Sequence, residues 1–163
     1  MSASREAVFD TLRSLDIPFE RYEHPPVATV AEAEAHWQRI DAAHCKNLFL
    51  RNQRGDRHYL VIAGHSKRVD LRQLADQIGD GKLSFASPER LMKWLGLTPG
   101  AVSPFGLLND AAHHVRVFLD SDLRRAERIT FHPNDDTVTL ALGFADFERF
   151  LQHVGHAVRV VSI

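Results

Sequence analysis

The fold is decided by residues 45–63, Cys45-Lys46-Asn47-Leu48-Phe49-Leu50-Arg51, then Asn52-Gln53-Arg54-Gly55-Asp56-Arg57, then His58-Tyr59-Leu60-Val61-Ile62-Ala63. The first and last of these runs are rich in leucine, aromatic and β-branched residues, which favour buried strands. The middle run has the composition of a hairpin turn. The stretch therefore predicts an antiparallel pair of strands.

Helices and further strands are expected on both sides of this hairpin. Before it, the pattern predicts a helix through Leu15, a strand at 19–22, and a helix from a Thr29–Glu32 capping box to Trp37. After it, we expect helices at 71–78, 88–95 and 145–154, and strands at 82–86, 114–119, 128–131, 136–142 and 156–162. The two-proline, two-glycine segment 98–106 is expected to be an irregular loop.

This order of elements predicts the fold class. Hairpins and helix crossovers in one short chain indicate an α/β protein, a mixed β-sheet with helices packed on it. At 163 residues, without a linker or an internal repeat, the chain is expected to form a single domain over 1–163.

Composition limits the cellular setting. The chain is 44% hydrophobic and 25% charged, and it has neither a long apolar stretch nor an apolar core near its N-terminus. Its one cysteine, Cys45, excludes an intramolecular disulfide and fits a reducing compartment. We therefore expect a cytoplasmic protein that does not bind a membrane.

Charge is unevenly distributed along the chain. The net charge of −1 argues against a protein that coats long nucleic acids. Residues 46–72, however, carry seven basic side chains against two acidic ones, a balance of +5. This region either faces a phosphate backbone or is a solvated surface of strands and turns.

The histidines and the cysteine do not indicate a metal or a nucleophile. Ten histidines are present, but none has a spacing such as His-Glu-x-x-His, so we expect neither a metal nor a cofactor. Cys45 lies between His44 and Lys46, and adjacent residues on a strand point to opposite faces. A buried, inert cysteine is the better interpretation.

Two motifs remain as candidates for chemistry. Lys46-Asn47 begins a strand that otherwise looks buried, and alternation places Lys46 on the face of Leu48 and Leu50. The lysine ammonium therefore either reaches solvent at the sheet edge or lines a cleft. In the loop Gly100-Ala101-Val102-Ser103-Pro104, glycine permits close approach to a ligand and proline stiffens the exit. Its amides could stabilise an oxyanion, or the loop could be a plain turn.

Together with Phe131-His132-Pro133-Asn134, these motifs resemble the YbaK/ProX family of trans-editing aminoacyl-tRNA deacylases. Lys46 and Gly100-x-x-x-Pro104 are similar to features of the wider superfamily. The Lys46–Leu50 run and the Ser103–Asn109 run look more like its ProX branch, which clears Ala-tRNA(Pro). The resemblance covers nearly the whole chain and implies a curved, partly closed mixed sheet.

The resemblance also implies a function and a site. It implies a hydrolase that removes a mischarged amino acid, above all alanine, from tRNA(Pro), with the tRNA acceptor end as a partner and prolyl-tRNA synthetase as a candidate partner. DNA is not expected as a ligand, because the sequence shows no helix-turn-helix with a basic second helix. The expected catalytic residues are Lys46, Gly100 and Ala101. The expected substrate-binding residues are Val30, Asn47, Leu48, Ser103, Pro104 and His132.

Two alternatives stay open at this point. Relatives in the family clear cysteine, serine or threonine with nearly the same framework, so the amino acid is not fixed by the motifs. A non-catalytic module that binds the aminoacyl acceptor end would explain the basic region and the glycine loop equally well.

Overall fold

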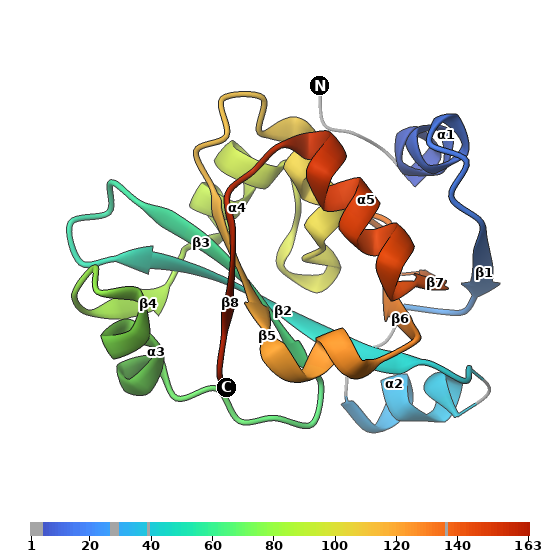
Figure 1. Cartoon of the computed structure of the whole chain (residues 1–163), viewed down its shortest axis with the longest axis horizontal. Coiled ribbons are helices and arrows are strands. Elements are labelled where there is room, and N and C mark those ends of the chain that lie inside the picture. Colours follow the sequence, from blue (N-terminus) through green and yellow to red (C-terminus); the bar gives the residue numbers. More distant parts are fainter. Residues whose placement is uncertain (1–4, 27–29, 39, 136) are drawn as a thin grey trace.

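The computed structural model describes residues 5–26, 30–38, 40–135 and 137–163, apart from the side chains of Val30, Ala31 and Ala33. Eight strands form one mixed sheet in the order β1-β7-β6-β2-β3-β5-β8, with β4 also paired to β2 (Figure 1). The strands are β1 (Phe19–Glu23), β2 (Ala43–Asn52), β3 (His58–Gly64), β4 (Leu83–Phe85), β5 (Arg116–Asp120), β6 (Arg128–Phe131), β7 (Val138–Gly143) and β8 (Val158–Val161).

The described residues also form five α-helices and three short 3-10 helices. They are α1 (Arg5–Ser14), α2 (Val30–Trp37), α3 (Leu71–Ile78), α4 (Pro88–Leu95), α5 (Phe144–Val154), η1 (Pro99–Ala101), η2 (Pro104–Asn109) and η3 (Ser121–Arg125). The expected helices and strands are therefore present, but segment 98–106 is not irregular throughout. Two 3-10 helices form there because Pro99 and Pro104 each supply a preset φ at a first helical position.

Strand β2 joins the two halves of the sheet. One edge of β2 pairs with β3 in antiparallel register, Cys45 opposite Gly64 through Arg51 opposite His58. On its other edge, pairing with β6 ends at His44 and pairing with β4 starts at Leu50. In the described part of the chain, this second edge of β2 thus has no neighbouring strand at Lys46, Asn47 and Leu48, although the first edge is paired with β3 there.

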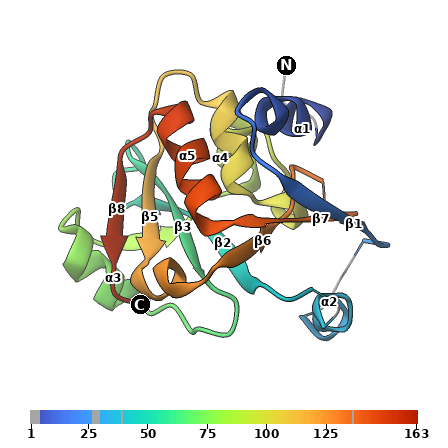
Figure 2. The same cartoon turned by 45° about the vertical axis from the view of Figure 1, so that its right-hand side comes forward.

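The sheet packs two hydrophobic cores, one on each face. The larger core contains Phe105, Phe147 and Phe150 and lies under α1, α5 and η2 (Figures 1 and 2). The smaller core contains Leu50 and Leu74 and lies under α3. The mixed α/β fold is confirmed. The sheet is open, because β1 and β8 end it without pairing to each other, so it does not reach the partial closure that the resemblance implied.

Local signals explain why the helices flanking β4 begin and end where they do. The Asp70 carboxylate accepts hydrogen bonds from the first turn of α3, and Gly79 ends that helix at a φ of 79°. Ser87 caps α4 in the same way, and Gly96 ends it at a φ of 66°. The expected cap at Thr29 lies outside the described residues.

Candidate active site

A small cavity lies beside the unpaired segment of β2. Its volume is about 280 Å³, and it is bounded by β2, the β4–α4 connection, α4 and the loop that carries the glycine motif. The lining residues are Asn47, Leu48, Phe49, Phe85, Ala86, Pro88, Leu91, Pro99 and Val102. The gap in strand pairing therefore opens onto a pocket that is apolar apart from one amide.

That amide belongs to Asn47, and its oxygen is incompletely satisfied. The Oδ1 atom of Asn47 is buried and has no hydrogen-bond partner within the described structure. A buried acceptor without a donor costs about 1–3 kcal/mol, so such a group indicates a missing partner. The main-chain amide of Ala86 donates to the Phe49 carbonyl at 3.0 Å, so the main-chain groups of Phe49 point toward this edge of β2. By alternation, the main-chain groups of Asn47 point toward the same edge.

The glycine loop forms one wall of the site. Pro99 and Val102 line the cavity, and Gly100 between them is exposed. Ala101 is buried, and its N–H donates to the Thr98 carbonyl at 3.0 Å. The Ala101 amide is thus engaged within the turn.

Ser103 and Pro104 hold this loop in place. Ser103 is fully buried, and its hydroxyl oxygen accepts from the Phe105 amide at 3.1 Å. Pro104 is buried at the start of η2. The Phe105 ring meets the Phe131 ring edge to face at 6.0 Å, which ties the loop to the end of β6, one residue before His132.

His132 belongs to a group of rings next to α2. Its Nδ1 lies 2.9 Å from the Val138 carbonyl, and its ring centre lies 6.1 Å from that of His24. His24 stacks on His36 at 5.0 Å, and its Nε2 lies 2.8 Å from the Thr139 hydroxyl. His132 is therefore held at the end of β6 by both backbone and ring contacts.

A second group of aromatic rings lies at the end of α2, and none of its residues was among the predicted site residues. Trp37 stacks on His44 at 4.7 Å and meets His65 edge to face at 4.9 Å. Burial, and then the neighbouring His65, lowers the pKa of His44. In the sequence, the signal for this group is the concentration of histidine and tryptophan between residues 24 and 65.

Lys46 lies on the face that alternation predicted. It shares that face with Leu48 and Leu50, which pack against the smaller core. Its ammonium donates to the Lys67 main-chain carbonyl in the loop that follows β3. Lys46 is thus next to Asn47 in sequence, but it is not part of the cavity lining.

Cys45 is a partly buried free cysteine. Burial raises the pKa of its thiol to about 12, so the thiolate is disfavoured at neutral pH. Within the described ranges, three or more His, Cys, Asp or Glu side chains do not come together in a way that could hold a metal ion.

The basic region 46–72 divides into paired and unpaired charges. Lys67 binds Asp120 at 2.8 Å and Asp122 at 2.6 Å, so its charge is neutralised locally. Arg57 binds Asp80 at 2.8 Å. In the described part, three further exposed arginines lack an ion pair: Arg54, Arg68 and Arg72.

The structure brings some predicted site residues together and leaves others apart. Asn47 and Leu48 share the cavity with the glycine loop. Lys46 and His132 lie outside its lining. Val30 begins α2, but its side chain lies outside the described part. The apolar walls Phe85, Pro88 and Leu91 were missed, because they come from elements that only the tertiary fold places beside Asn47.

Comparison with known proteins identifies the family. The aminoacyl-tRNA editing domain family matches residues 24–150, and this chain belongs to it. The predicted resemblance is thereby confirmed, and so is the class of enzyme, an aminoacyl-tRNA editing domain of the deacylase type.

Individual relatives agree with this. The chain is 41% identical over 164 residues to the prolyl-tRNA editing protein ProX of Acetoanaerobium sticklandii, covering 98% of each chain. It is 35% identical to the bovine prolyl-tRNA synthetase associated domain-containing protein 1, over 93% of this chain and 91% of that protein. A crystal structure described as a candidate trans-editing enzyme for prolyl-tRNA synthetase has the same fold, with a TM-score of 0.71, 21% identity and coverage of 100% and 99%.

In the part of the chain that the structure describes, the helices are too short or too polar to cross a membrane.

Proposed function

We propose that this chain is a trans-editing hydrolase that deacylates mischarged tRNA(Pro), with Ala-tRNA(Pro) as its preferred substrate. The names of its relatives support prolyl-tRNA editing as the broad activity. The observation that carries the finer proposal is the cavity of about 280 Å³ with one unsatisfied acceptor, Asn47 Oδ1. Its volume is at the lower end of the range of about 300–1,000 Å³ typical of ligand sites, and it can hold a small aminoacyl group.

Size accounts for the choice of alanine. A synthetase pocket built for proline gains only about 1–3 kcal/mol against a substrate lacking methylene groups, so alanine is attached by error. A second pocket that admits alanine and excludes the larger proline corrects that error by steric exclusion. The rigid walls from Pro88 and Pro99 suit such a sieve.

Charge accounts for the orientation of the substrate. An aminoacyl ester carries a free α-ammonium, which is a strong donor with no acceptor capacity. Asn47 Oδ1 is the buried acceptor without a donor in this cavity. We assign the ammonium to this oxygen, and a hydrogen bond to a charged group contributes about 1.5–3 kcal/mol.

Hydrolysis then needs stabilisation of an oxyanion. A water adds to the ester carbonyl carbon, the bond from that carbon to the ribose oxygen breaks, and the departing ribose oxygen takes the proton that the water loses and becomes a hydroxyl. We assign the Gly100 N–H as the first donor for the oxyanion, because the Ala101 N–H already donates to the Thr98 carbonyl and must release it to join. Lys46 supplies positive charge to the carbonyl or the terminal phosphate after its ammonium leaves the Lys67 carbonyl.

The remaining predicted residues have supporting tasks in this scheme. Leu48 forms a pocket wall, Val30 stays a wall residue proposed from the sequence, and His132 orients the substrate or the water. Ser103 and Pro104 position the glycine loop. The acceptor end of tRNA(Pro) is the macromolecular ligand, and its phosphate backbone contacts the unpaired arginines of residues 46–72. Prolyl-tRNA synthetase is a second partner, and both interactions take place in the cytoplasm.

The decisive experiment is single-turnover hydrolysis of Ala-tRNA(Pro) and Pro-tRNA(Pro). Native protein should clear the first and spare the second. Lys46→Ala should slow the first by about 10²-fold, on the order of 3 kcal/mol, with an unchanged circular dichroism spectrum. Lys82→Ala, at an exposed lysine outside the cavity lining, is the matched control and should be fully active. A folded, fully active Lys46→Ala protein would refute the catalytic assignment.

Two further comparisons test the pocket. Asn47→Ala should slow hydrolysis of Ala-tRNA(Pro) by about 10- to 100-fold but have little effect on N-acetyl-Ala-tRNA(Pro), which lacks the ammonium. Val30→Ala should admit larger amino acids. Equal hydrolysis of alanyl and prolyl esters by native protein would refute the steric sieve. Faster hydrolysis of a cysteinyl, seryl or threonyl ester would show that this amino acid, and not alanine, is the preferred substrate. Binding without hydrolysis would show a non-catalytic module that binds the acceptor end.

A further inference from the structure

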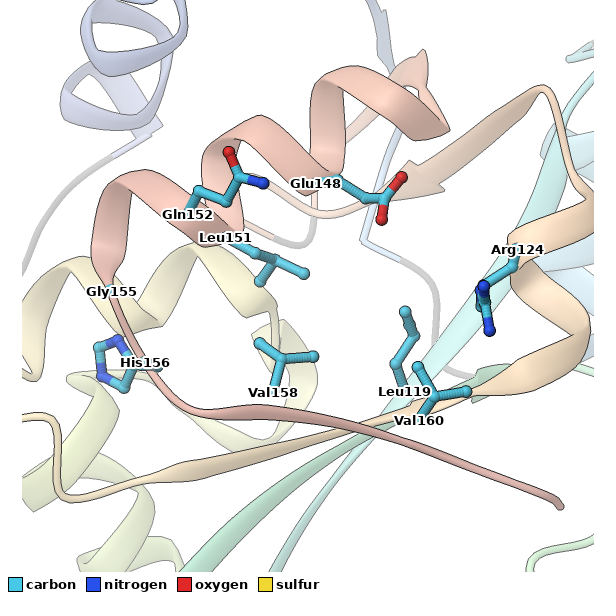
Figure 3. Close-up of a pocket in the computed structure, with 9 residues that line it drawn as sticks. All are labelled: Leu119, Arg124, Glu148, Leu151, Gln152, Gly155, His156, Val158 and Val160. Atoms are coloured by element: carbon cyan, nitrogen blue, oxygen red, sulfur yellow. The ribbon is translucent and has the colours of Figure 1, made fainter.

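A second cavity lies between α5 and β8, at the end of the sheet. Its volume is about 430 Å³, and Leu119, Leu151, Val158 and Val160 form its apolar part. Figure 3 shows these side chains converging between the helix and the strand, with Glu148 and Arg124 near one end of the cavity. It is lined by different residues from those beside Asn47.

The outer edge of β8 offers unpaired main-chain groups. Strand β8 pairs with β5 in parallel register, Val117 opposite Val158, and the Val117 N–H donates to the Ala157 carbonyl at 3.0 Å. By alternation, Ala157 and Arg159 direct their main-chain groups toward β5, whereas Val158 and Val160 direct theirs outward. Because β8 ends the sheet, no described strand occupies that side (Figure 1).

At Ser162, the main-chain groups on the outer edge of β8 already have hydrogen-bond partners. It is the next outward-facing residue, and the Gln77 side chain binds both of its main-chain groups. Gln77 Nε2 donates to the Ser162 carbonyl at 2.6 Å, and the Ser162 N–H donates to Gln77 Oε1 at 3.1 Å. An amide side chain thus takes the place of a neighbouring strand at Ser162, and the open edge is confined to Val158 and Val160.

The side chains on the two faces of β8 determine which kind of strand could pair with its outer edge. Val158 and Val160 are 40% and 41% exposed and line the cavity. Arg159 points to the other face, where it is exposed, and within the described residues it has no ion-pair partner. A pairing strand therefore meets two aliphatic side chains on the cavity face and one cation on the other face.

We propose that β8 and α5 form a docking site for an extended segment of a partner protein, which adds to the sheet as a further strand. The segment has aliphatic residues opposite Val158 and Val160 and an acidic residue opposite Arg159. Main-chain hydrogen bonds along β8 supply affinity, while the cavity and Arg159 supply specificity.

A second copy of this chain fits less well than such a segment. The antiparallel register that uses both open residues pairs Val158 with Val160 of the other copy. That register sets Arg159 directly opposite its own equivalent, and like charges directly opposite are destabilising. The register shifted toward the C-terminus needs the main-chain groups of Ser162, which Gln77 already binds.

The test uses the full ¹⁵N-labelled chain and the capped peptide Thr-Val-Glu-Val-Thr, with Thr-Val-Lys-Val-Thr as its matched control. Titration to millimolar peptide, followed by NMR, should shift the amides of Val158, Val160 and Glu148. The glutamate peptide should bind at least about 5-fold more tightly than the lysine peptide, which corresponds to about 1 kcal/mol for an opposite-charge cross-strand pair. Shifts elsewhere, or equal affinities, would overturn the proposal.

Variants separate the two recognition elements. Arg159→Glu should reverse the preference between the peptides, whereas Arg54→Glu in the exposed β2–β3 turn should keep it. Val160→Pro removes one outward N–H without removing a bond to β5, and it should abolish binding. If that variant does not fold, reversal by Arg159→Glu still decides the question. A native dimer in sedimentation equilibrium that Val160→Pro dissociates would show that this edge serves self-association instead.

Discussion

His58 makes this protein sensitive to acid. The side chain is 1% exposed, its Nδ1 lies 2.8 Å from His114 Nε2, and Arg90 donates to its Nε2 at 3.0 Å. The Arg90 bond requires an unprotonated Nε2, so the fold accepts only the neutral ring. Burial, followed by the nearby His114 and Arg90 charges, lowers the pKa of His58 from 6.5 to about 4.

The sign and size of the effect follow from this shift. In the unfolded chain, His58 takes up a proton below pH 6.5, whereas in the folded chain it does so only below about pH 4. Its contribution to stability is therefore complete above pH 6.5 and is lost as the pH falls toward 4. With about 1.4 kcal/mol per pKa unit, the total loss is on the order of 3 kcal/mol.

Urea unfolding at pH 7 and pH 4.5 measures this loss. Native protein should lose about 2.5 kcal/mol more between the two pH values than His58→Gln, whose side chain does not titrate in this range. The subtraction removes the contributions of the titrating groups that do not contact His58. Equal pH dependence in the two proteins would refute the reasoning. Because Arg90 lies in α4, which also supplies Leu91 to the cavity wall, the acid transition should loosen that wall.

Three other outcomes follow from the structure. Asp110→Ala should lower the free energy of unfolding, measured in urea, by about 3 kcal/mol. The reason is that the buried Asp110 carboxylate lies 2.9 Å from His156 Nε2 and accepts from the Val115 amide at 2.8 Å. A loss below about 1 kcal/mol would contradict this. Affinity for tRNA should be weak and should fall on going from low to physiological salt, and a flat response would remove the role of residues 46–72. Hydrolysis should continue at the same rate after incubation with a strong chelator, whereas a loss restored by zinc would show a metal site.

Sequence predicted the features that depend on nearby residues. The β2–β3 hairpin and the caps at Asp70 and Ser87 were predictable because strand composition, turn residues and capping side chains all act over a few positions. Alternation also placed Lys46 on the correct face of β2. The site was less predictable. The Lys46 ammonium donates to the Lys67 carbonyl, and Asn47 faces a gap between β6 and β4. Both features depend on contacts between segments far apart in the chain.

The way β2 links the sheet has a consequence for the order of folding. The β2–β3 hairpin and β4 are close in the chain, and every residue lining the cavity beside Asn47 falls within residues 47–102. Strand β1 needs a distant partner, with Phe19 opposite Leu142, and among the described strands the β1-β7-β6 part of the sheet pairs with β2 at Ala43 and His44. Local contacts form faster than distant ones because their loop-closure entropy is smaller. During synthesis on the ribosome, the walls of the cavity should therefore assemble first, and His132 should join them only after the β6–β7 segment has emerged.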